Sequence, residues 1–358
     1  MDRRKFLQAS IGLSVTAALP STAFSGECFA ANLPNCAADS QSSMLFKKEH
    51  RDQTPRIGVI AVGIDGCELL SSLNGRLPHL CRPVAIDFSS YAFEEVSADR
   101  KILIPYDGMN SSGNHRATKS FAKDAKLRIT EAVADLDIAF IVAGMGGLAG
   151  TDIVPAVAEL LREQQIFSIA AAISPCTFEN LFHHQVAQAS ADKLCRIANA
   201  VFPINCEWSE QGLSPTEFER LYRGITLPFS EPGLVNLDVD DVISLMSNGG
   251  RNAMGYGSAK GKDAAEIATR QAITYPLLGA RLLSTASGIL ISIEGPPASL
   301  ARLGKVCRIF DTVRDAIGYA DHDQVLVCGA IRNETLVDEF RVTILAGGVL
   351  AKENGLHS

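Results

Sequence analysis

The feature that most constrains the fold is a glycine-rich segment that directly follows an apolar run. Residues 137–142 read DIAFIV, and residues 143–155 continue as AGMGGLAGTDIVP. A buried strand that leads into glycines and then into a helix start is typical of a phosphate-binding loop, because backbone N–H groups and the helix N-terminus point at one spot. We therefore expect a nucleotide site here. Leu148 and Asp152 stand where further glycines would be expected, so the loop is partly obstructed.

Short β-rich runs alternate with helical patterns from Ile57 onward. Continuous runs of Val, Ile and Ala with helices between them indicate a parallel sheet buried on both faces, which predicts an α/β fold with a Rossmann-like first domain. The expected strands are Ile57–Gly63, Val84–Phe88, Asp137–Met145, Phe167–Ile173 and Ala200–Ile204. The expected helices of this half are Ser120–Ala134, Pro155–Gln164 and Thr216–Gly224, the last one stopped by Pro228 and Pro232.

A second block follows the first, and at 358 residues the chain has room for two domains with substantial cores. Its expected helices are Asp241–Met246 and Asp263–Thr274, and its expected strands are Gly288–Ile293, Gln324–Ile331 and Phe340–Ala346. This predicts a second, α+β domain. We divide the chain into a signal-like leader (1–30), a linker (31–55), a nucleotide-binding domain (56–213), a central helix with its connection (214–232) and a C-terminal activation domain (233–350).

Composition excludes some partners. The net charge is −7, and no patch is dense in Lys and Arg, which argues against nucleic acid as a partner. Nine cysteines are scattered singly without a CxxC pair, so we expect no metal site. Such cysteines are typical of small core residues in a chain that folds in a reducing place. His183 and His184 form no metal pair either, because adjacent residues of a helix point in different directions.

The N-terminus has the pattern of an export signal. Basic residues 3–5 precede an uncharged stretch at 8–26, and small-residue sites follow at 23–25 and 28–30. Paired arginines before Phe-Leu resemble a twin-arginine signal. The apolar core is too short for a comfortable membrane-spanning helix. We expect a protein that is exported, or tethered to the membrane through this leader. The alternative is a cytoplasmic protein whose uncleaved leader contacts the membrane surface.

Four segments carry a resemblance to a known family. Residues 146–152, GGLAGTD, are similar to the signature GGGTGTG of the FtsZ/tubulin superfamily, the filament-forming GTPases, with three departures. Residues 233–241, GLVNLDVDD, resemble the loop that this family inserts into the nucleotide site of the next subunit. Residues 252–257 and 275–278 also follow the family closely. The similarity runs from about Arg56 to Gly348.

The resemblance implies binding of GTP or GDP, with Mg²⁺ as a further candidate ligand. Glu179 matches the carboxylate that contacts the ribose, His183 replaces the Arg that usually follows it, and Asn205 falls where an Asn near the base is expected. The nucleotide-binding residues implied in this way are Gly63, Gly66, Gly108, Gly113, Asn114, Gly144, Gly146, Gly147, Gly150, Thr151, Glu179, His183 and Asn205.

The same half of the site has features that weaken nucleotide binding. A carboxylate about 4 Å from a phosphate charge costs on the order of 4 kcal/mol at an effective dielectric constant near 20. Asp65 and Asp152 would each contribute such repulsion unless a cation lies between them and the nucleotide. Asp152 has a second interpretation, as the N-cap of a helix beginning at Ile153. The interval from Asn205 to Asn236, 31 positions, is shorter than in the family, so guanine selectivity is also expected to be weakened.

The acidic segment is the best preserved of the motifs. The resemblance places Asn236, Asp238 and Asp241 at the positions that orient the attacking water and a cation in the neighbouring subunit's site. Carboxylates suit this task, because phosphoryl transfer requires an oriented, polarised water. The competing interpretation is that Asp238 and Asp240 simply cap the helix that begins at Asp241. Capping alone accounts neither for Asn236 nor for Pro232-Gly233.

Two functions remain open. The first is a GTP-binding protein that self-assembles head to tail, with hydrolysis weak or absent, so that its partner is itself or another FtsZ-like subunit. The second is a non-catalytic pseudo-GTPase that binds or caps a filament of an intact relative. A Rossmann-type dehydrogenase fits poorly, because Gly63 and Gly66 do not complete the dinucleotide-binding fingerprint.

Overall fold

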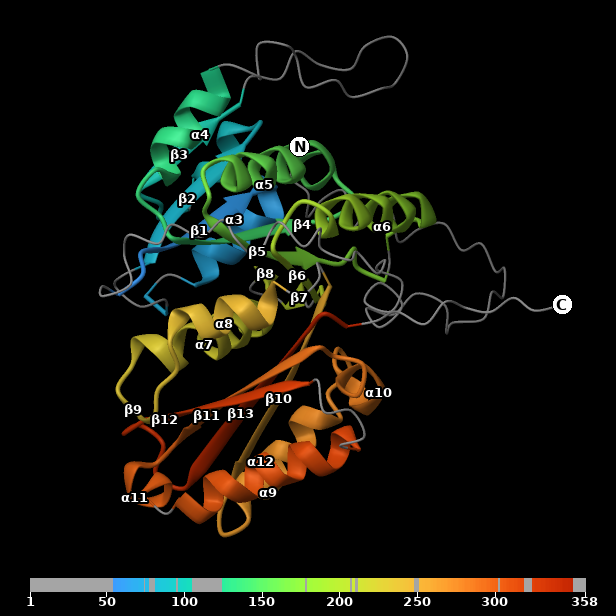
Figure 1. Ribbon diagram of the computed structural model, residues 1–358. Helices are drawn as coiled ribbons and strands as arrows, with labels where there is room; N and C mark the ends of the chain where they lie inside the picture. The colour runs from blue at the N-terminus through green and yellow to red at the C-terminus, as the bar shows by residue number, and fades with distance from the viewer. Residues whose placement is uncertain are drawn as a thin grey trace, which may run out of the picture.

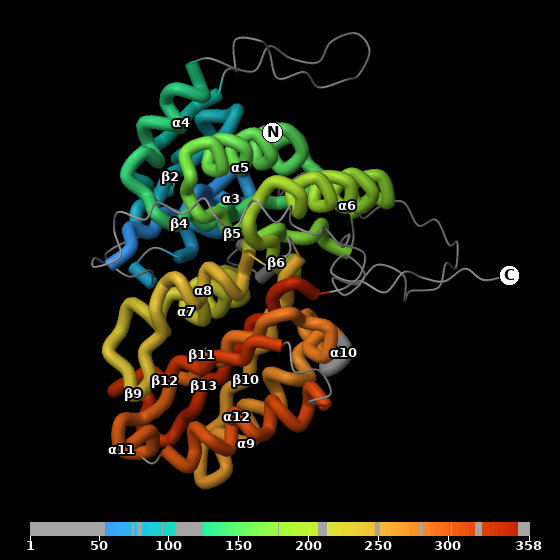
Figure 2. Tube along the Cα trace, viewed as in Figure 1, coloured from blue at the N-terminus to red at the C-terminus, as the bar shows by residue number. Residues whose placement is uncertain are grey.

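The computed structural model describes residues 54–349 except residues 74, 77–80, 95, 105–123, 178, 207, 210–211, 248–250, 302 and 319–323. The N-terminal leader and the predicted site residues Gly108, Gly113 and Asn114 therefore lie outside the described residues. Two sheets lie on opposite sides of one long helix, α7 (Thr216–Ser230), coloured yellow in Figure 1. The tube in Figure 2 follows the same path from the first domain through α7 into the second.

The first domain is a parallel sheet, as predicted, but it has six strands where five were expected, since Arg100–Leu103 forms a further edge strand. Its order is β3-β2-β1-β4-β5-β6, with bounds β1 (Ile57–Val62), β2 (Cys81–Asp87), β3 (Arg100–Leu103), β4 (Ile138–Gly144), β5 (Phe167–Ile173) and β6 (Ala200–Ile204). The associated helices are α3 (Gly63–Ser72), α4 (Lys126–Val133), α5 (Val154–Glu163) and α6 (Leu181–Cys195), with a short π-helix η6 (Ala149–Ile153) before α5 and a 3-10 turn η4 (Ser90–Phe93) after β2.

Both faces of this sheet are covered, which explains its continuous apolar strands. Along β1, Ile60 and Val62 join the core formed with α4, α5 and α6, whereas Val59 and Ala61 join the core formed with α3 and α7. This alternation follows from the period of two residues in a β-strand. The sheet is therefore buried on both sides by helices that also frame its carboxyl edge.

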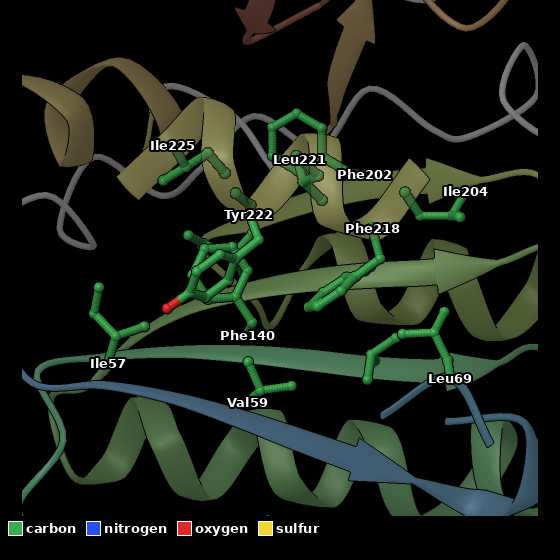
Figure 3. Close-up of a cluster of buried hydrophobic side chains, with 14 of the residues drawn as sticks. Ile57, Val59, Leu69, Phe140, Phe202, Ile204, Phe218, Leu221, Tyr222 and Ile225 are labelled. Atoms are coloured by element: carbon green, nitrogen blue, oxygen red, sulfur yellow. The ribbon is translucent and has the colours of Figure 1, made fainter. Parts of the chain in front are cut away.

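Helix α7 is fixed to the sheet by its apolar stripe. Phe218, Leu221, Tyr222 and Ile225 recur at helical spacing and are each at most 1% exposed. Figure 3 shows these side chains pointing toward the strands, where Phe218 and Tyr222 gather with Phe140 of β4. The ring centroid of Phe140 lies 6.1 Å from that of Phe218 and 4.9 Å from that of Tyr222, and both distances are within the range of favourable aromatic pairs. This packing holds the two ends of α7 in fixed places relative to the first domain.

The second domain is a five-stranded mixed sheet in the order β10-β13-β11-β12-β9. Its strands are β9 (Gly233–Val235), β10 (Asn252–Lys260), β11 (Gly288–Gly295), β12 (Val325–Arg332) and β13 (Glu339–Gly347). Helices α9 (Ala264–Ile273), α10 (Gly279–Leu283), α11 (Pro297–Leu300) and α12 (Leu303–Ile317) belong to the same domain, and α8 (Val239–Met246) lies beside α7 (Figure 1). In the part of the chain that is described, no helix is long and apolar enough to cross a membrane.

The predicted end of the central helix is wrong. The helix does not stop at Gly224 but continues to Ser230 with Pro228 inside it. An internal proline costs about 3 kcal/mol, yet the helix lies between two sheets, and burying Ile225 and Leu227 offsets that cost. Pro228 also packs against β12, since a Cβ placed on Gly329 would lie 2.8 Å from the Pro228 Cβ.

Candidate nucleotide site and acidic loop

Those predicted nucleotide residues that the structure describes meet at one edge of the first sheet. The carboxyl ends of parallel strands share an edge, so the loops after β1, β4, β5 and β6 are neighbours there. The glycine loop (Gly144–Gly150) is held against β5 by Met145, whose N–H donates to the carbonyl oxygen of Ile173 at 2.9 Å. Gly63 and Gly146 adopt φ values of +77° and +93°, which favour glycine.

Most glycines of this edge are required by close packing between the loops themselves. A Cβ on Gly63 would lie 2.6 Å from the Ala149 Cβ, and one on Gly146 would lie 2.7 Å from the carbonyl oxygen of His183. At Gly66 and Gly150 an added Cβ would collide with a backbone carbonyl oxygen. The absence of a side chain at these positions lets the loops approach one another, which shapes this edge of the sheet.

Gly147 differs from the others. It is exposed, and a Cβ built on it would find no atom within 4 Å. A phosphate needs bare backbone facing open space, and Gly147 provides it at the start of η6, where helix N–H groups also point outward. Thr151 secures this turn, because its Oγ1 donates to the Gly147 carbonyl oxygen at 2.8 Å.

Two carboxylates lie in the same loops. Asp65 is in the first turn of α3, and it covers Gly144 so closely that a Cβ there would collide with the Asp65 carboxylate. Asp152 is inside η6, which begins at Ala149 with Leu148 at its N-cap. The interpretation of Asp152 as an N-cap is therefore wrong, because the helix begins four residues earlier than expected. Acidic groups in first turns neutralise the positive helix end that a phosphate would use.

The predicted ribose contact is held in a defined position. Glu179 Oε1 accepts a hydrogen bond from the backbone N–H of Cys176 at 2.9 Å, and its Oε2 lies 2.9 Å from His183 Nδ1. His183 is in the first turn of α6, whose N-cap Asn180 accepts from the His183 N–H at 2.9 Å. Glu179, His183 and Gly146 are thus brought together, as the sequence predicts.

Asn205 links the edge to α7 and to the second domain. Its backbone N–H donates to Glu217 Oε2 at 2.9 Å, and the Tyr275 hydroxyl donates to Glu217 Oε1 at 2.6 Å. Burial, followed by the Glu217 charge, raises the pKa of Tyr275 above its ordinary value. The side-chain Oδ1 of Asn205 is buried without a hydrogen-bond partner within the described ranges. An orphaned buried oxygen at this position suits a hydrogen-bonding base.

A disulfide joins Cys176 to Cys206, with a Cα–Cα distance of 5.3 Å. The expectation of nine separate reduced cysteines is therefore wrong for this pair. The two residues are 30 positions apart in sequence, but they follow the neighbouring strands β5 and β6 and so lie side by side. Cys67 and Cys195 are buried and form no disulfide, as expected of core residues.

The acidic loop lies at the other end of α7. Glu217 and Asn205 mark the start of that helix, and the loop follows its last residue, Ser230, so the separation is about 22 Å at 1.5 Å per residue. Figure 1 shows β9 at this far end and β6 at the near one. The acidic loop and the glycine loop of one chain therefore do not form a common site.

The side chains of the acidic loop face solvent. Asn236, Asp238 and Asp241 are all exposed. Asp238 occupies the N-cap position of α8 but makes no capping hydrogen bond through its side chain, so the capping interpretation does not account for it. Asn236 has a local role that the sequence did not reveal, because its Oδ1 accepts from the Gly233 N–H at 2.8 Å. In the described part of the chain, no group of three or more His, Cys, Asp or Glu side chains is arranged to hold a metal ion.

A parallel sheet with a glycine loop at its carboxyl edge, joined by a central helix to a mixed sheet, defines a two-domain nucleotide-binding protein. Residues 57–208 match the Tubulin/FtsZ family GTPase domain, and residues 250–350 match the FtsZ family C-terminal domain. The chain thus contains a Tubulin/FtsZ family GTPase domain and an FtsZ family C-terminal domain and is homologous to FtsZ, and its GTPase domain implies GTP or GDP as the nucleotide.

Individual relatives agree with this assignment. The chain is 27% identical over 333 residues to Cell division protein FtsZ 1 of Thermococcus kodakarensis, covering 89% of this chain and 87% of the relative. An FtsZ variant from M. jannaschii has 25% identity and a TM-score of 0.71, over 83% of this chain and 92% of that one. CetZ2 from Haloferax volcanii, solved as a GTPγS-bound protofilament, shares the fold with a TM-score of 0.65 at 23% identity, over 83% of this chain and 94% of that one.

Proposed function

We propose that this protein binds guanine nucleotide at the glycine-loop edge and assembles head to tail with a second copy or another FtsZ-like subunit, with slow hydrolysis. The observation that carries the proposal is the separation of the two half-sites by the length of α7. Because Asn236, Asp238 and Asp241 are exposed at the end of the molecule away from Gly147, they are available only to a neighbour's nucleotide. A head-to-tail contact repeats along a filament.

The residues present fit a guanine nucleotide. Gly147 offers open backbone for phosphate, the Glu179 carboxylate is preset for the ribose, and Asn205 Oδ1 is a buried acceptor for the base. GTP when bound would supply the phosphoanhydride to be hydrolysed. The partner's acidic loop would orient water there, while Asp65 and Asp152 raise the negative charge around the phosphates. Mg²⁺ is the counterion that suits such a group of oxygens.

Slow hydrolysis follows from the acidic residues beside the glycine loop. Phosphoryl transfer is promoted by neutralising charge on the transferred group, and carboxylates in the first turns of α3 and η6 oppose this. The contrast between an exposed acidic loop and a nucleotide site crowded by carboxylates favours a second candidate function. A subunit with an available acidic loop and a poor nucleotide site of its own would cap the end of a filament made by an intact relative.

The disulfide supports a location outside the reducing cytoplasm. Disulfides persist in oxidising compartments, so the Cys176–Cys206 bond agrees with the twin-arginine-like pattern of residues 3–5. We propose that the protein is exported or membrane-tethered through its leader. A fusion of residues 1–35 to a reporter that works only after export tests this, with Arg3 and Arg4 changed to Lys as the control. Retention of both fusions inside the cell would contradict the proposal.

The assembly proposal is tested with the full-length chain and GTP. We expect stoichiometric bound GTP or GDP after purification, GTP-dependent sedimentation of polymers, and phosphate release slower than polymer formation. Asp238→Ala is expected to leave nucleotide binding unchanged, because Asp238 serves the neighbouring subunit. A chain that retains no nucleotide and sediments only with an intact FtsZ would replace self-assembly with the capping function.

A further inference from the structure

The Cys176–Cys206 disulfide lies between the residues expected to contact the ribose and the base. Cys176 donates its backbone N–H to Glu179 Oε1 at 2.9 Å, and Cys206 directly follows Asn205. The backbone N–H of Cys206 donates to Ser174 Oγ at 3.3 Å. The backbone of Cys176 is thus hydrogen-bonded to the carboxylate on the ribose side, and the backbone of Cys206 is hydrogen-bonded to Ser174 in the neighbouring loop.

The disulfide links the two chain segments just beyond the last paired residues of strands β5 and β6. Ile173 of β5 pairs with Ile204 of β6, and the Ser174 N–H donates to the Ile204 carbonyl oxygen at 2.8 Å. After these contacts the two chains become loops, and the disulfide fixes their separation at a Cα–Cα distance of 5.3 Å. The disulfide therefore adds a covalent link between the loops that carry Glu179 and Asn205.

We propose that the Cys176–Cys206 disulfide is a positioning element of the guanine nucleotide site, so that recognition of ribose and base depends on the oxidation state of the two thiols. This inference rests on the proposed function, since it requires nucleotide binding at this edge. Oxidised, the pair holds the Glu179 carboxylate and the Asn205 amide at one spacing. Reduced, the two loops move independently, and the ribose and base contacts weaken while the glycine loop keeps its phosphate contacts.

The redox step is thiol–disulfide exchange with a disulfide partner, either a protein or a small molecule. The Cys206 thiolate attacks one partner sulfur to form a mixed disulfide, and the Cys176 thiolate then displaces the partner. Two electrons pass from the two cysteines to the partner disulfide, and their two protons end on the partner's thiols. Cys206 is the thiol that reacts first with the partner, because it is partly exposed whereas Cys176 is 5% exposed.

The test compares the full-length chain before and after reduction with dithiothreitol, with affinities measured for GTP, GDP, 2′-deoxy-GTP and 3′-deoxy-GTP. Peptide mapping without reductant first establishes the bond between Cys176 and Cys206. We expect reduction to weaken GTP and GDP binding at least tenfold each, leaving their ratio unchanged, and to bring both deoxy-GTP affinities close to that of GTP. The Cys307→Ser variant, which loses an exposed free thiol, should respond to reduction as the native chain does.

Several results would overturn the inference. These are free thiols at both positions, equal affinities in the two redox states, or an equal loss for all four nucleotides, since the last marks a general structural effect. The Cys176→Ser, Cys206→Ser double variant should bind like the reduced chain, and the reduction experiment stands without it if this variant does not fold. Absence of guanine nucleotide binding by the oxidised chain would overturn the proposed function as well. Redox-insensitive binding would overturn only the disulfide's role.

Discussion

The hydroxyl of Tyr275 donates a 2.6 Å hydrogen bond to Oε1 of Glu217, and this contact joins the second domain to the base edge of the first. Glu217 is 3% exposed and accepts from the Asn205 N–H through its other oxygen. Arg220 donates to the same hydroxyl at 3.3 Å, and its guanidinium lies 4.0 Å from the Tyr256 ring centroid. A change at the base edge can therefore reach β10 through two side chains of α7.

Tyr275→Phe tests this connection. Removing the hydroxyl leaves a buried carboxylate oxygen with one partner fewer, which is expected to lower the free energy of unfolding by about 2 kcal/mol. Urea unfolding at pH 7 measures the loss. Tyr91→Phe is the matched control, because Tyr91 is 68% exposed and its loss should change stability little. An unchanged unfolding midpoint in Tyr275→Phe would show that the contact contributes nothing.

The hydrogen bond between Tyr275 and Glu217 predicts that folding stability depends on pH in the alkaline range. The folded pKa of Tyr275 lies above its ordinary value of 10.0, so the folded state binds the hydroxyl proton more tightly than the unfolded chain. This contribution is complete below pH 10 and is lost as the pH rises toward the folded pKa. The stability difference between the native chain and Tyr275→Phe should therefore shrink above pH 10. A difference that stays constant to pH 11.5 would contradict this assignment.

Gly147 and Gly146 offer a matched pair of substitutions one residue apart. Gly147→Ala should change stability by less than about 0.5 kcal/mol, because the added Cβ meets nothing within 4 Å, yet it should weaken nucleotide binding by filling the phosphate position. Gly146→Ala should cost about 2 kcal/mol or more, since its φ is +93° and the Cβ would lie 2.7 Å from the His183 carbonyl oxygen. Thermal unfolding and GTP titration of both variants separate the effects. Unaltered GTP binding by Gly147→Ala would move the phosphate position elsewhere.

The continuous apolar strands were predictable, whereas contacts between distant segments were not. Phe167–Ile173 and Ala200–Ile204 match β5 and β6 residue for residue, because both faces of these strands are buried. Strand β10, which contains Gly255 and Gly257, was not among the expected strands. The structure explains the two glycines: a Cβ at either position would collide with a carbonyl oxygen of α9. The helix packs so closely on the strand that only glycine fits.

In the candidate site, too, local patterns were predictable from the sequence and contacts between distant segments were not. The glycine loop and the acidic loop have local patterns that identify them, but the bonds from Tyr275 and Asn205 to Glu217 depend on the tertiary fold. The disulfide had a weak signal in the sequence, since Cys176 and Cys206 each follow the end of an expected strand by two or three residues. That signal becomes informative only once the two strands are known to be neighbours. The hydrogen bond from the Thr226 hydroxyl to the Tyr222 carbonyl oxygen, by contrast, is local in the sequence, because both residues belong to α7.

Asp65→Asn tests whether charge limits nucleotide affinity. The substitution preserves the shape that covers Gly144 while removing one negative charge near the phosphate position. GTP should bind at least tenfold more tightly to the variant, and the dependence of affinity on Mg²⁺ should weaken, because repulsion at about 4 Å is worth several kcal/mol. Asp99→Asn is the control: it makes the same charge change on an exposed residue before β3, at the amino edge of the sheet. Equal affinity of native and Asp65→Asn chains would remove Asp65 as the cause of slow turnover.

Asp238→Ala separates a role in a neighbour's site from a structural role in its own helix. A capping aspartate would lose about 1 kcal/mol of stability on this change, but Asp238 makes no capping bond, so the unfolding free energy should stay within about 0.5 kcal/mol. GTP hydrolysis by assembled chains should fall at least tenfold, while binding stays unchanged. Mixing Asp238→Ala with a variant defective in the glycine loop should restore partial turnover, because each contact needs only one intact half from each subunit. If the mixture stays inactive while both variants bind their partners, the two half-sites do not complete one another across the interface.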